Sequence, residues 1–298
     1  MRTPIQTLTI SVLLLFALPS RAEVEVYFAQ DLSPYPASAN NDPRPPYPKS
    51  QAVAAQFLAR LQGTSTESFE SFAPGTTPSN LVFGSVTATL FASAIGDCVV
   101  DQVLDSRSTS GGGFPSTGTK CLGLLVGRAI HPEEYFRVSF SSPQSAFGFY
   151  GTDVETSSFR LRLARADGST SDVYPPITVP QGNAGVFYLG VIDRARPFTS
   201  VTFYGTGSVL DGFDFDDLTI GTPQQVLPLS PTLRMTAYQW LEITGTVGAT
   251  YRIESSTDLT PTSWVTLTSF VLPASPYQWQ DTTASGVRRR FYRAASVP

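Results

Sequence analysis

The sequence predicts an all-β protein: a jelly-roll-like or Greek-key β-sandwich with one short N-terminal helix, followed by a small C-terminal β-sandwich module. Charged residues are only 15% of the 298-residue chain, whereas Gly, Pro, Phe and Tyr are plentiful. Such a composition favours short strands joined by turns, because aromatic and β-branched residues lose rotamer freedom in helices. Apolar residues also recur at period two over most of the chain, with turn residues between the segments.

Residues 1–22 are typical of a secretory signal peptide. Arg2 precedes a largely apolar run over residues 8–18, and small residues then lead to a cleavage site after Ala22. A membrane span needs about 20 apolar residues, so this run is too short to be a transmembrane anchor. The alternative is a buried N-terminal helix. We expect a secreted protein, extracellular or periplasmic, with no transmembrane anchor.

The mature chain is acidic. Loss of residues 1–22 removes Arg2 and Arg21 and leaves 18 basic against 24 acidic residues, a formal charge of −6. This charge excludes a general nucleic-acid binder. The remaining length suffices for two domains, since single cores usually stop growing near about 250–300 residues.

The segment 23–49 is rich in proline and is expected to form an extended arm, because proline fits neither a helix interior nor a central strand. Over residues 51–61, Val53, Phe57 and Leu61 share one helical face. Ser50 is the expected N-cap and Gly63 the expected stop. This helix should pack on a sheet.

A β-sandwich domain is predicted over residues 50–221, a proline-containing linker over 222–232, and the small module over 233–298. A hairpin turn is expected at Asp167-Gly168. The strands expected in the sandwich domain are 82–91, 135–140, 146–150, 159–164, 185–191, 200–204 and 216–220. Those expected in the module are 233–243, 250–255, 264–270, 277–281 and 289–294. All three tryptophans lie in the module and are expected in its core.

The only two cysteines, Cys98 and Cys121, are predicted to form a disulfide, because export places them in an oxidising compartment. Closing a loop of this size contributes about 3 kcal/mol in the chain-entropy estimate. Metal ligation is the alternative, but two thiols without a nearby histidine do not complete a zinc site.

Carboxylates near the two ends of the sandwich domain suggest a calcium site. If Leu218 and Ile220 face the core, strand alternation puts Asp216 on their side and Asp217 on the other. Glu70 stands in a similar position beside Phe72. The sharper hypothesis is that Glu70, Asp216 and Asp217 hold a structural Ca²⁺. The simpler one is a carboxylate hydrogen-bonded to backbone amides.

No catalytic residue is predicted. The one histidine, His131, precedes a proline, and the chain lacks the Gly-x-Ser-x-Gly nucleophile motif. A pair of carboxylates across a cleft could support glycoside hydrolysis, but the sequence singles out no such pair.

Two functions are compatible with these features. One is a non-catalytic extracellular structural or interaction protein, which presents loops such as that around Asp153 to a cell-surface protein. The other is a carbohydrate-binding module that stacks an extracellular glycan on exposed aromatic rings, for which Tyr150, Tyr188 and Tyr204 are candidates. Alternation leaves these tyrosines equally suited to the core.

Three segments resemble the passenger domain of exported bacterial proteins of the PEP-CTERM kind: residues 67–76, 140–153 and 213–221. The resemblance covers about residues 50–221 and implies a sandwich without known catalysis. Members usually end in a Pro-Glu-Pro motif, an apolar helix and a basic tail, which this chain lacks. Residues 251–259 and 291–294, with Trp264, instead resemble a small terminal β module of other exported bacterial proteins.

Overall fold

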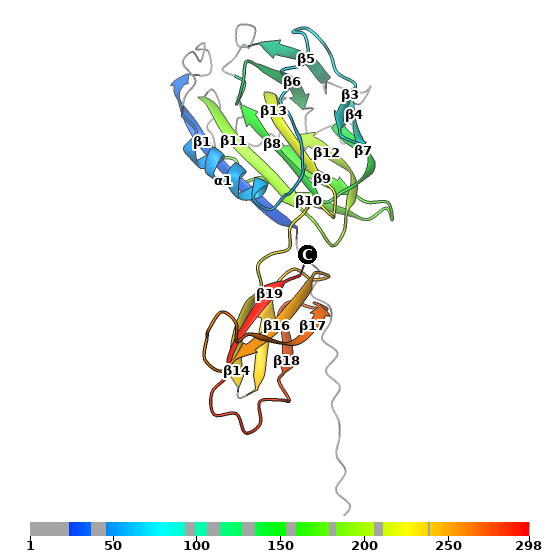
Figure 1. Cartoon of the computed structure of the whole chain (residues 1–298). Coiled ribbons are helices and arrows are strands. Elements are labelled where there is room, and N and C mark those ends of the chain that lie inside the picture. Colours follow the sequence, from blue (N-terminus) through cyan, green and yellow to red (C-terminus); the bar gives the residue numbers. More distant parts are fainter. Residues whose placement is uncertain are drawn as a thin grey trace, which may run out of the picture. The chain divides into compact units, whose positions relative to one another are not determined.

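The computed structural model describes residues 24–36, 46–92, 99–105, 114–126, 135–152, 159–178, 183–205, 211–237 and 239–297. These residues confirm the all-β class, with α1 (Pro48–Leu58) as the one helix among them (Figure 1). The chain forms two compact units, which divide between Leu229 and Ser230. The predicted signal peptide lies outside the described residues.

The first unit is a sandwich of two antiparallel sheets. Within the described ranges, one sheet has seven strands in the order β1-β11-β8-β13-β6-β5, with β2 paired to β13. The other has six, in the order β10-β9-β12-β7-β4-β3. From β7 onward most connections cross between the sheets, as in Greek-key and jelly-roll sandwiches.

The strands of the seven-stranded sheet are β1 (Glu25–Pro36), β2 (Thr66–Glu67), β5 (Val99–Asp105), β6 (Lys120–Val126), β8 (Ala146–Thr152), β11 (Asn183–Ile192) and β13 (Asp211–Gly221). Those of the six-stranded sheet are β3 (Asn80–Phe83), β4 (Val86–Ala92), β7 (Tyr135–Gln144), β9 (Phe159–Ala164), β10 (Thr170–Val173) and β12 (Phe198–Gly205). The expected turn at Asp167-Gly168 joins β9 to β10, which pair as a hairpin.

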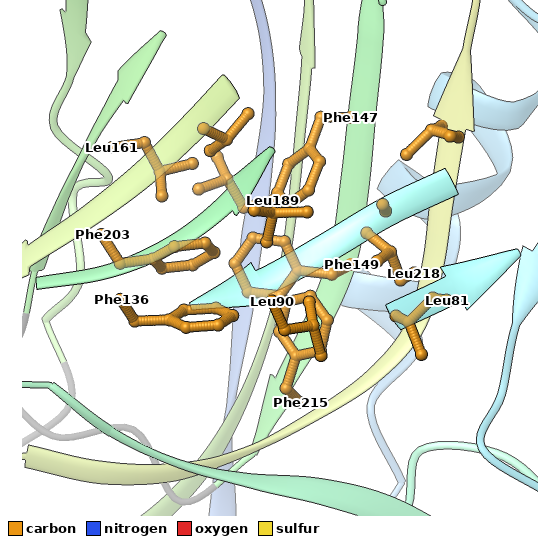
Figure 2. Packing of buried hydrophobic residues seen from close by; sticks show 14 of the residues in the cluster. Leu81, Leu90, Phe136, Phe147, Phe149, Leu161, Leu189, Phe203, Phe215 and Leu218 are labelled. Atoms are coloured by element: carbon orange, nitrogen blue, oxygen red, sulfur yellow. The ribbon is translucent and has the colours of Figure 1, made fainter. Parts of the chain in front are cut away.

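Aromatic side chains from both sheets fill the space between them. Phe149 of β8 packs on Phe215 of β13 with ring centroids 4.7 Å apart, and on Phe203 of β12 at 5.4 Å. Phe136 of β7 lies 5.1 Å from Phe203 (Figure 2). These rings are fully buried. In the six-stranded sheet, Phe136 alternates with Tyr135 and Phe203 with Tyr204, so these tyrosines lie on the face opposite the core.

The N-terminal segment differs from the expected extended arm. Glu25–Pro36 forms β1, an edge strand whose residues 25–32 pair with Ile192 back to Gly185 of β11. Pro34 and Pro36 come only after this regular register, where it shifts. An edge strand tolerates proline because one side of its backbone makes no ladder bonds.

Helix α1 begins at Pro48, earlier than expected, and Ser50 is not its N-cap. The carboxylate of Asp31, on β1, accepts hydrogen bonds from the Ser50 amide and hydroxyl, both at 2.8 Å, and from the Lys49 amide at 3.3 Å. A residue distant in sequence therefore satisfies the amides that a local cap usually satisfies.

Part of the expected linker belongs to the first unit. Val226 is 1% exposed and forms an isolated β-bridge with Leu61. The Leu227 amide donates to the carbonyl of Arg60 at 2.7 Å, and the Arg60 guanidinium donates to the Leu227 carbonyl at 2.9 Å. The buried side chain of Val226 and these backbone bonds hold the start of the expected linker against the first unit.

The second unit has two three-stranded antiparallel sheets, ordered β14-β15-β18 and β17-β16-β19. Their strands are β14 (Thr232–Ala237), β15 (Trp240–Thr244), β16 (Thr250–Ser256), β17 (Val265–Val271), β18 (Tyr277–Gln280) and β19 (Phe291–Ser296). The expectation of three core tryptophans is wrong: Trp240 is 41% exposed, and the fully buried residues include Tyr251, Ile243 and Ile253. Trp279 only packs against this core.

Two expected strands are hairpins. The segment 82–91 is divided between β3 and β4 by a turn at Gly84, whose φ of 60° suits glycine. The segment 233–243 is divided between β14 and β15, where Gln239 has a φ of 68°. Apolar alternation continues through such tight turns, so periodicity alone does not reveal them.

Candidate ligand-binding face

Two of the three candidate tyrosines are buried beneath α1 and face no solvent. Tyr150 is 8% and Tyr188 2% exposed, and both pack in a cluster with Phe57 of the helix. Burial raises the pKa of both phenols well above its ordinary value. These two rings hold the helix on the seven-stranded sheet, and they are not ligand platforms in this fold.

Tyr204 has a different place. It lies on the outer face of the six-stranded sheet, the face turned away from the sandwich core. Its neighbours Phe203 and Val201 point inward and are fully buried, whereas Tyr204 is half-buried. We call this outer face the binding face.

Three aromatic residues form a row across neighbouring strands of the binding face. Phe91 of β4 lies 6.0 Å from Tyr135 of β7, and Tyr135 lies 5.8 Å from Tyr204 of β12, between ring centroids. Tyr135 and Tyr204 are direct partners in the strand register. Phe91 is 41% exposed. We call Phe91, Tyr135 and Tyr204 the aromatic row.

Three arginines lie over these rings. The guanidinium of Arg137 is 5.2 Å from the centroid of Phe91 and 5.4 Å from that of Tyr135. Those of Arg160 and Arg162, on β9, are 4.6 Å and 5.3 Å from Tyr204. Cation–π contacts at such distances contribute about 0.5–1 kcal/mol each at exposed sites.

Asp172 of β10 fixes two of the arginines. It accepts from Arg162 Nε at 2.7 Å and Nη2 at 2.9 Å, and from Arg160 Nη1 at 2.6 Å. Hydrogen bonding to Arg162 lowers the pKa of Asp172. The carboxylate and its two guanidinium groups form an ordered polar edge beside Tyr204.

Only Tyr204 of this group was a candidate from the sequence, whereas Phe91, Tyr135 and the three arginines were missed. Alternation did contain the signal, because Tyr135 and Arg137 alternate with the buried Phe136 and Val138, and Arg160 and Arg162 alternate with the buried Leu161 and Leu163. Alternation does not predict which strands are neighbours, and here the order β9-β12-β7-β4 brings these residues together. Asp153, the remaining candidate, lies outside the described residues.

The carboxylates proposed for calcium anchor one loop, residues 116–120. Glu70 Oε1 accepts from the amides of Thr119 at 2.6 Å and Lys120 at 2.7 Å. Desolvation raises the pKa of Glu70, but these bonds outweigh it and the net shift is downward. Glu70 lies in a turn and not on a strand, so strand alternation does not apply to it.

The predicted orientation of Asp216 is wrong. The register of β13 against β8 shifts by one residue between Asp216 and Thr219, and Asp217 has a φ of 50°. This β-bulge places Asp216 on the face of Thr219, opposite the core residues Leu218 and Ile220. Alternation fails at this point because the strand is not regular through the bulge.

Asp216 is fully buried and holds the other end of the loop. Its carboxylate accepts from the amides of Ser116 at 2.8 Å, Thr117 at 3.1 Å and Asp217 at 2.8 Å. The Ser116 hydroxyl lies 2.8 Å from Asp216 and 3.2 Å from Asp217. Burial raises the pKa of Asp216 to about 8, and repulsion from Asp217 adds to the shift.

This geometry is that of carboxylates bonded to backbone amides. Within the part of the chain that the structure describes, no group of three His, Cys, Asp or Glu residues is arranged to hold a metal ion. Calcium at Glu70, Asp216 and Asp217 stays a prediction. So does the disulfide: Cys121 is buried in β6, and Cys98 lies outside the described residues.

Two further expectations concern the histidine and the membrane. His131 lies outside the described residues. No helix in the described ranges is long and apolar enough to cross a membrane.

None of the models of known protein families matches the chain, and no curated protein matches it. Among solved structures, the chain is similar to the K2 cleaved adhesin domain of Lys-gingipain, with 12% identity over 54% of this chain and 98% of that one and a TM-score of 0.33. A β-1,2-glucanase from Parabacteroides distasonis matches at 14% identity and a TM-score of 0.28, over 70% of this chain but 34% of the glucanase.

A third similar structure is the N-terminal CBM22 tandem domain of Xyn10C from Paenibacillus barcinonensis. It matches at 11% identity and a TM-score of 0.31, over 80% of this chain and 86% of that one. All three TM-scores are low, so these likenesses support no conclusion about function.

Proposed function

We propose that this protein is a secreted, non-catalytic binding protein whose sandwich unit binds carbohydrate on the outer face of its six-stranded sheet. The observation that carries the proposal is the aromatic row. Rings that remain half-buried or exposed across three strands offer apolar surface, and fixed polar groups stand beside them. Ligand sites commonly combine aromatic surface with a few well-placed polar groups in this way.

Secretion rests on residues 1–22, and the non-catalytic character rests on the chain's lack of a recognisable nucleophile or acid pair. The resemblance to PEP-CTERM passenger domains supports both. A structural or protein-interaction role is the second candidate. It requires none of the residues of the binding face, so the same experiment separates the two.

The test is affinity electrophoresis of the full mature chain in gels that contain soluble polysaccharides. Retardation by at least one polysaccharide is expected. Phe91→Ala should weaken binding by about 30-fold if this ring acts as a binding hot spot, where truncation costs about 2 kcal/mol or more. Trp240→Ala is the matched control, because Trp240 is 41% exposed like Phe91 but belongs to the second unit.

Tyr188→Phe is a second control, since this tyrosine is buried under α1 and should not change binding. No reducing ends should appear when the protein is incubated with a polysaccharide that it binds. Failure to bind any polysaccharide, or equal loss in the Phe91 and Trp240 variants, would contradict the proposal and favour a protein partner.

A further inference from the structure

The described strands of the binding face carry more positive than negative outward side chains, although the protein as a whole is acidic. Its outward side chains on the described strands include Arg137, Arg160 and Arg162 against a single carboxylate, Asp172. The whole chain carries a formal charge of −4. A local excess of two positive charges therefore opposes the sign of the molecule. Such a site favours an anionic ligand.

Arg137 is the centre of this excess. Arg160 and Arg162 share Asp172, whereas the Arg137 side chain makes no ion pair or hydrogen bond with any described residue. Its Nε is buried without a partner, but its terminal nitrogens are not among the buried unpaired atoms. Among the described residues no group accepts from these terminal nitrogens, so we take them as the donors for an arriving acceptor.

The Arg137 guanidinium packs on the rings of both Phe91 and Tyr135. A held guanidinium loses little conformational entropy when it binds, and its planar fork matches a carboxylate bidentately. Arg162 already shows this geometry on the same face, because its Nε and Nη2 bind the two oxygens of Asp172.

Arg137 and Arg162 lie in one line across the sheet. The register aligns Asp172, Arg162, Thr202, Arg137 and Phe91 on five adjacent strands. At about 4.8 Å between strands, this line spans about 19 Å. A line of this length fits several units of an extended polymer better than a single small molecule.

On the basis of the proposed carbohydrate function, we propose that the ligand is an acidic polysaccharide whose sugars carry carboxylate groups. Arg137 pairs with a uronate carboxylate, the aromatic row stacks against pyranose rings, and Asp172 with its two arginines meets ligand hydroxyls. Nucleic acid does not fit, because one guanidinium without a partner among the described residues, on an acidic chain, is too little charge for a polyphosphate.

The test compares two forms of one polymer on the full mature chain. Polygalacturonate is titrated against the protein, and so is its methyl ester, which keeps the sugar and the linkage but lacks the charge. Alginate serves as a second acidic probe, and neutral xylan, mannan and β-glucan complete the set. Binding to polygalacturonate or alginate should exceed binding to the ester and the neutral polymers, and should weaken with added salt.

Arg137→Gln should lower the affinity for the acidic polymer by about tenfold or more, as expected when a charge-assisted hydrogen bond is lost. Its effect on any binding of the ester should be smaller than its effect on binding of the acid. Arg137→Lys keeps the charge and should retain part of the affinity. Arg234→Gln is the control, since Arg234 pairs with Glu242 in the second unit. Thermal unfolding of each variant shows whether a loss of binding reflects a loss of fold.

The two proposals fail in different ways. Equal binding of the acid and the ester, or binding of neutral polymers alone, would overturn the acidic ligand and leave a carbohydrate-binding function. Acid binding that Arg137→Gln does not change in a folded variant would also overturn it. Absence of binding to every polysaccharide would overturn the carbohydrate function itself.

Discussion

A single extra residue decides where the acidic side chains of β13 lie. With Asp217 at a φ of 50°, the strand bulges, and Asp216 turns toward the loop at Ser116 and away from the sandwich core. A non-glycine residue in this left-handed region is unusual, although aspartate tolerates it better than most. Because of the bulge, the Asp216 carboxylate does not face the sandwich core and instead binds the loop of residues 116–120.

The buried Asp216 predicts a pH dependence of stability. Its pKa is about 8 in the folded protein and about 3.9 in the unfolded chain, so between these values the folded state holds an extra proton. The free energy of unfolding should therefore fall as pH rises from about 4 to about 8, by up to roughly 1.4 kcal/mol per pH unit. Chemical denaturation across this pH range measures it.

Asp216→Asn should flatten this slope. It should also lower stability near pH 4, because the amide cannot accept all of the bonds that the carboxyl accepts, and the two stability curves should approach each other as the pH rises. Asp167→Asn, at an exposed hairpin turn, should keep the wild-type slope. An unchanged slope in the Asp216 variant would mean that another group titrates.

At the scale of elements, the docking of α1 depends on two glycines. Gly148 of β8 and Gly190 of β11 are direct register partners beneath the ring of Phe57. A Cβ built on Gly190 would lie 2.5 Å from Phe57 Cδ2, and one on Gly148 would lie 2.7 Å from Phe57 Cε1. The sheet can have no side chain at these two positions, because the Phe57 ring packs directly on the backbone there.

A double-mutant cycle tests this contact. Gly190→Ala should destabilise the protein by about 1–3 kcal/mol, since it overpacks the site. Phe57→Ala should cost about 3–5 kcal/mol through the cavity that it leaves. The two losses should not add, because removal of the ring makes room for the new methyl group. Additive losses in urea denaturation would show that the ring and the glycine are independent.

The elements differ in how well the sequence predicts them. Strict alternation predicted β9 with its observed bounds and most of β7, β8, β11 and β12, because their inward residues face one continuous core. It predicted neither β1 nor the split of β3 from β4, since prolines suggested an arm and a tight turn preserves apolar alternation. The binding face could not be assembled, because cross-strand pairing joins residues as distant as Phe91 and Tyr204.

At the scale of the whole molecule, the two units have separate cores of unequal size. The buried clusters of the first unit include Phe149, Phe215 and Phe57, whereas the second unit is built around Tyr251 and Ile253. A small core supports only marginal stability, so the second unit should be the weaker of the two. Its three tryptophans are the only ones in the chain.

Tryptophan fluorescence of the full chain should therefore report the second unit alone, and circular dichroism should be dominated by the larger first unit. In urea, the fluorescence midpoint should come before the main dichroism midpoint. Ile253→Ala should cost about 2–5 kcal/mol in the fluorescence transition and leave the dichroism midpoint in place. Phe149→Leu, in the first unit, should lower the dichroism midpoint and leave the fluorescence midpoint in place. Coincident transitions that both variants shift together would mean that the units unfold as one cooperative body.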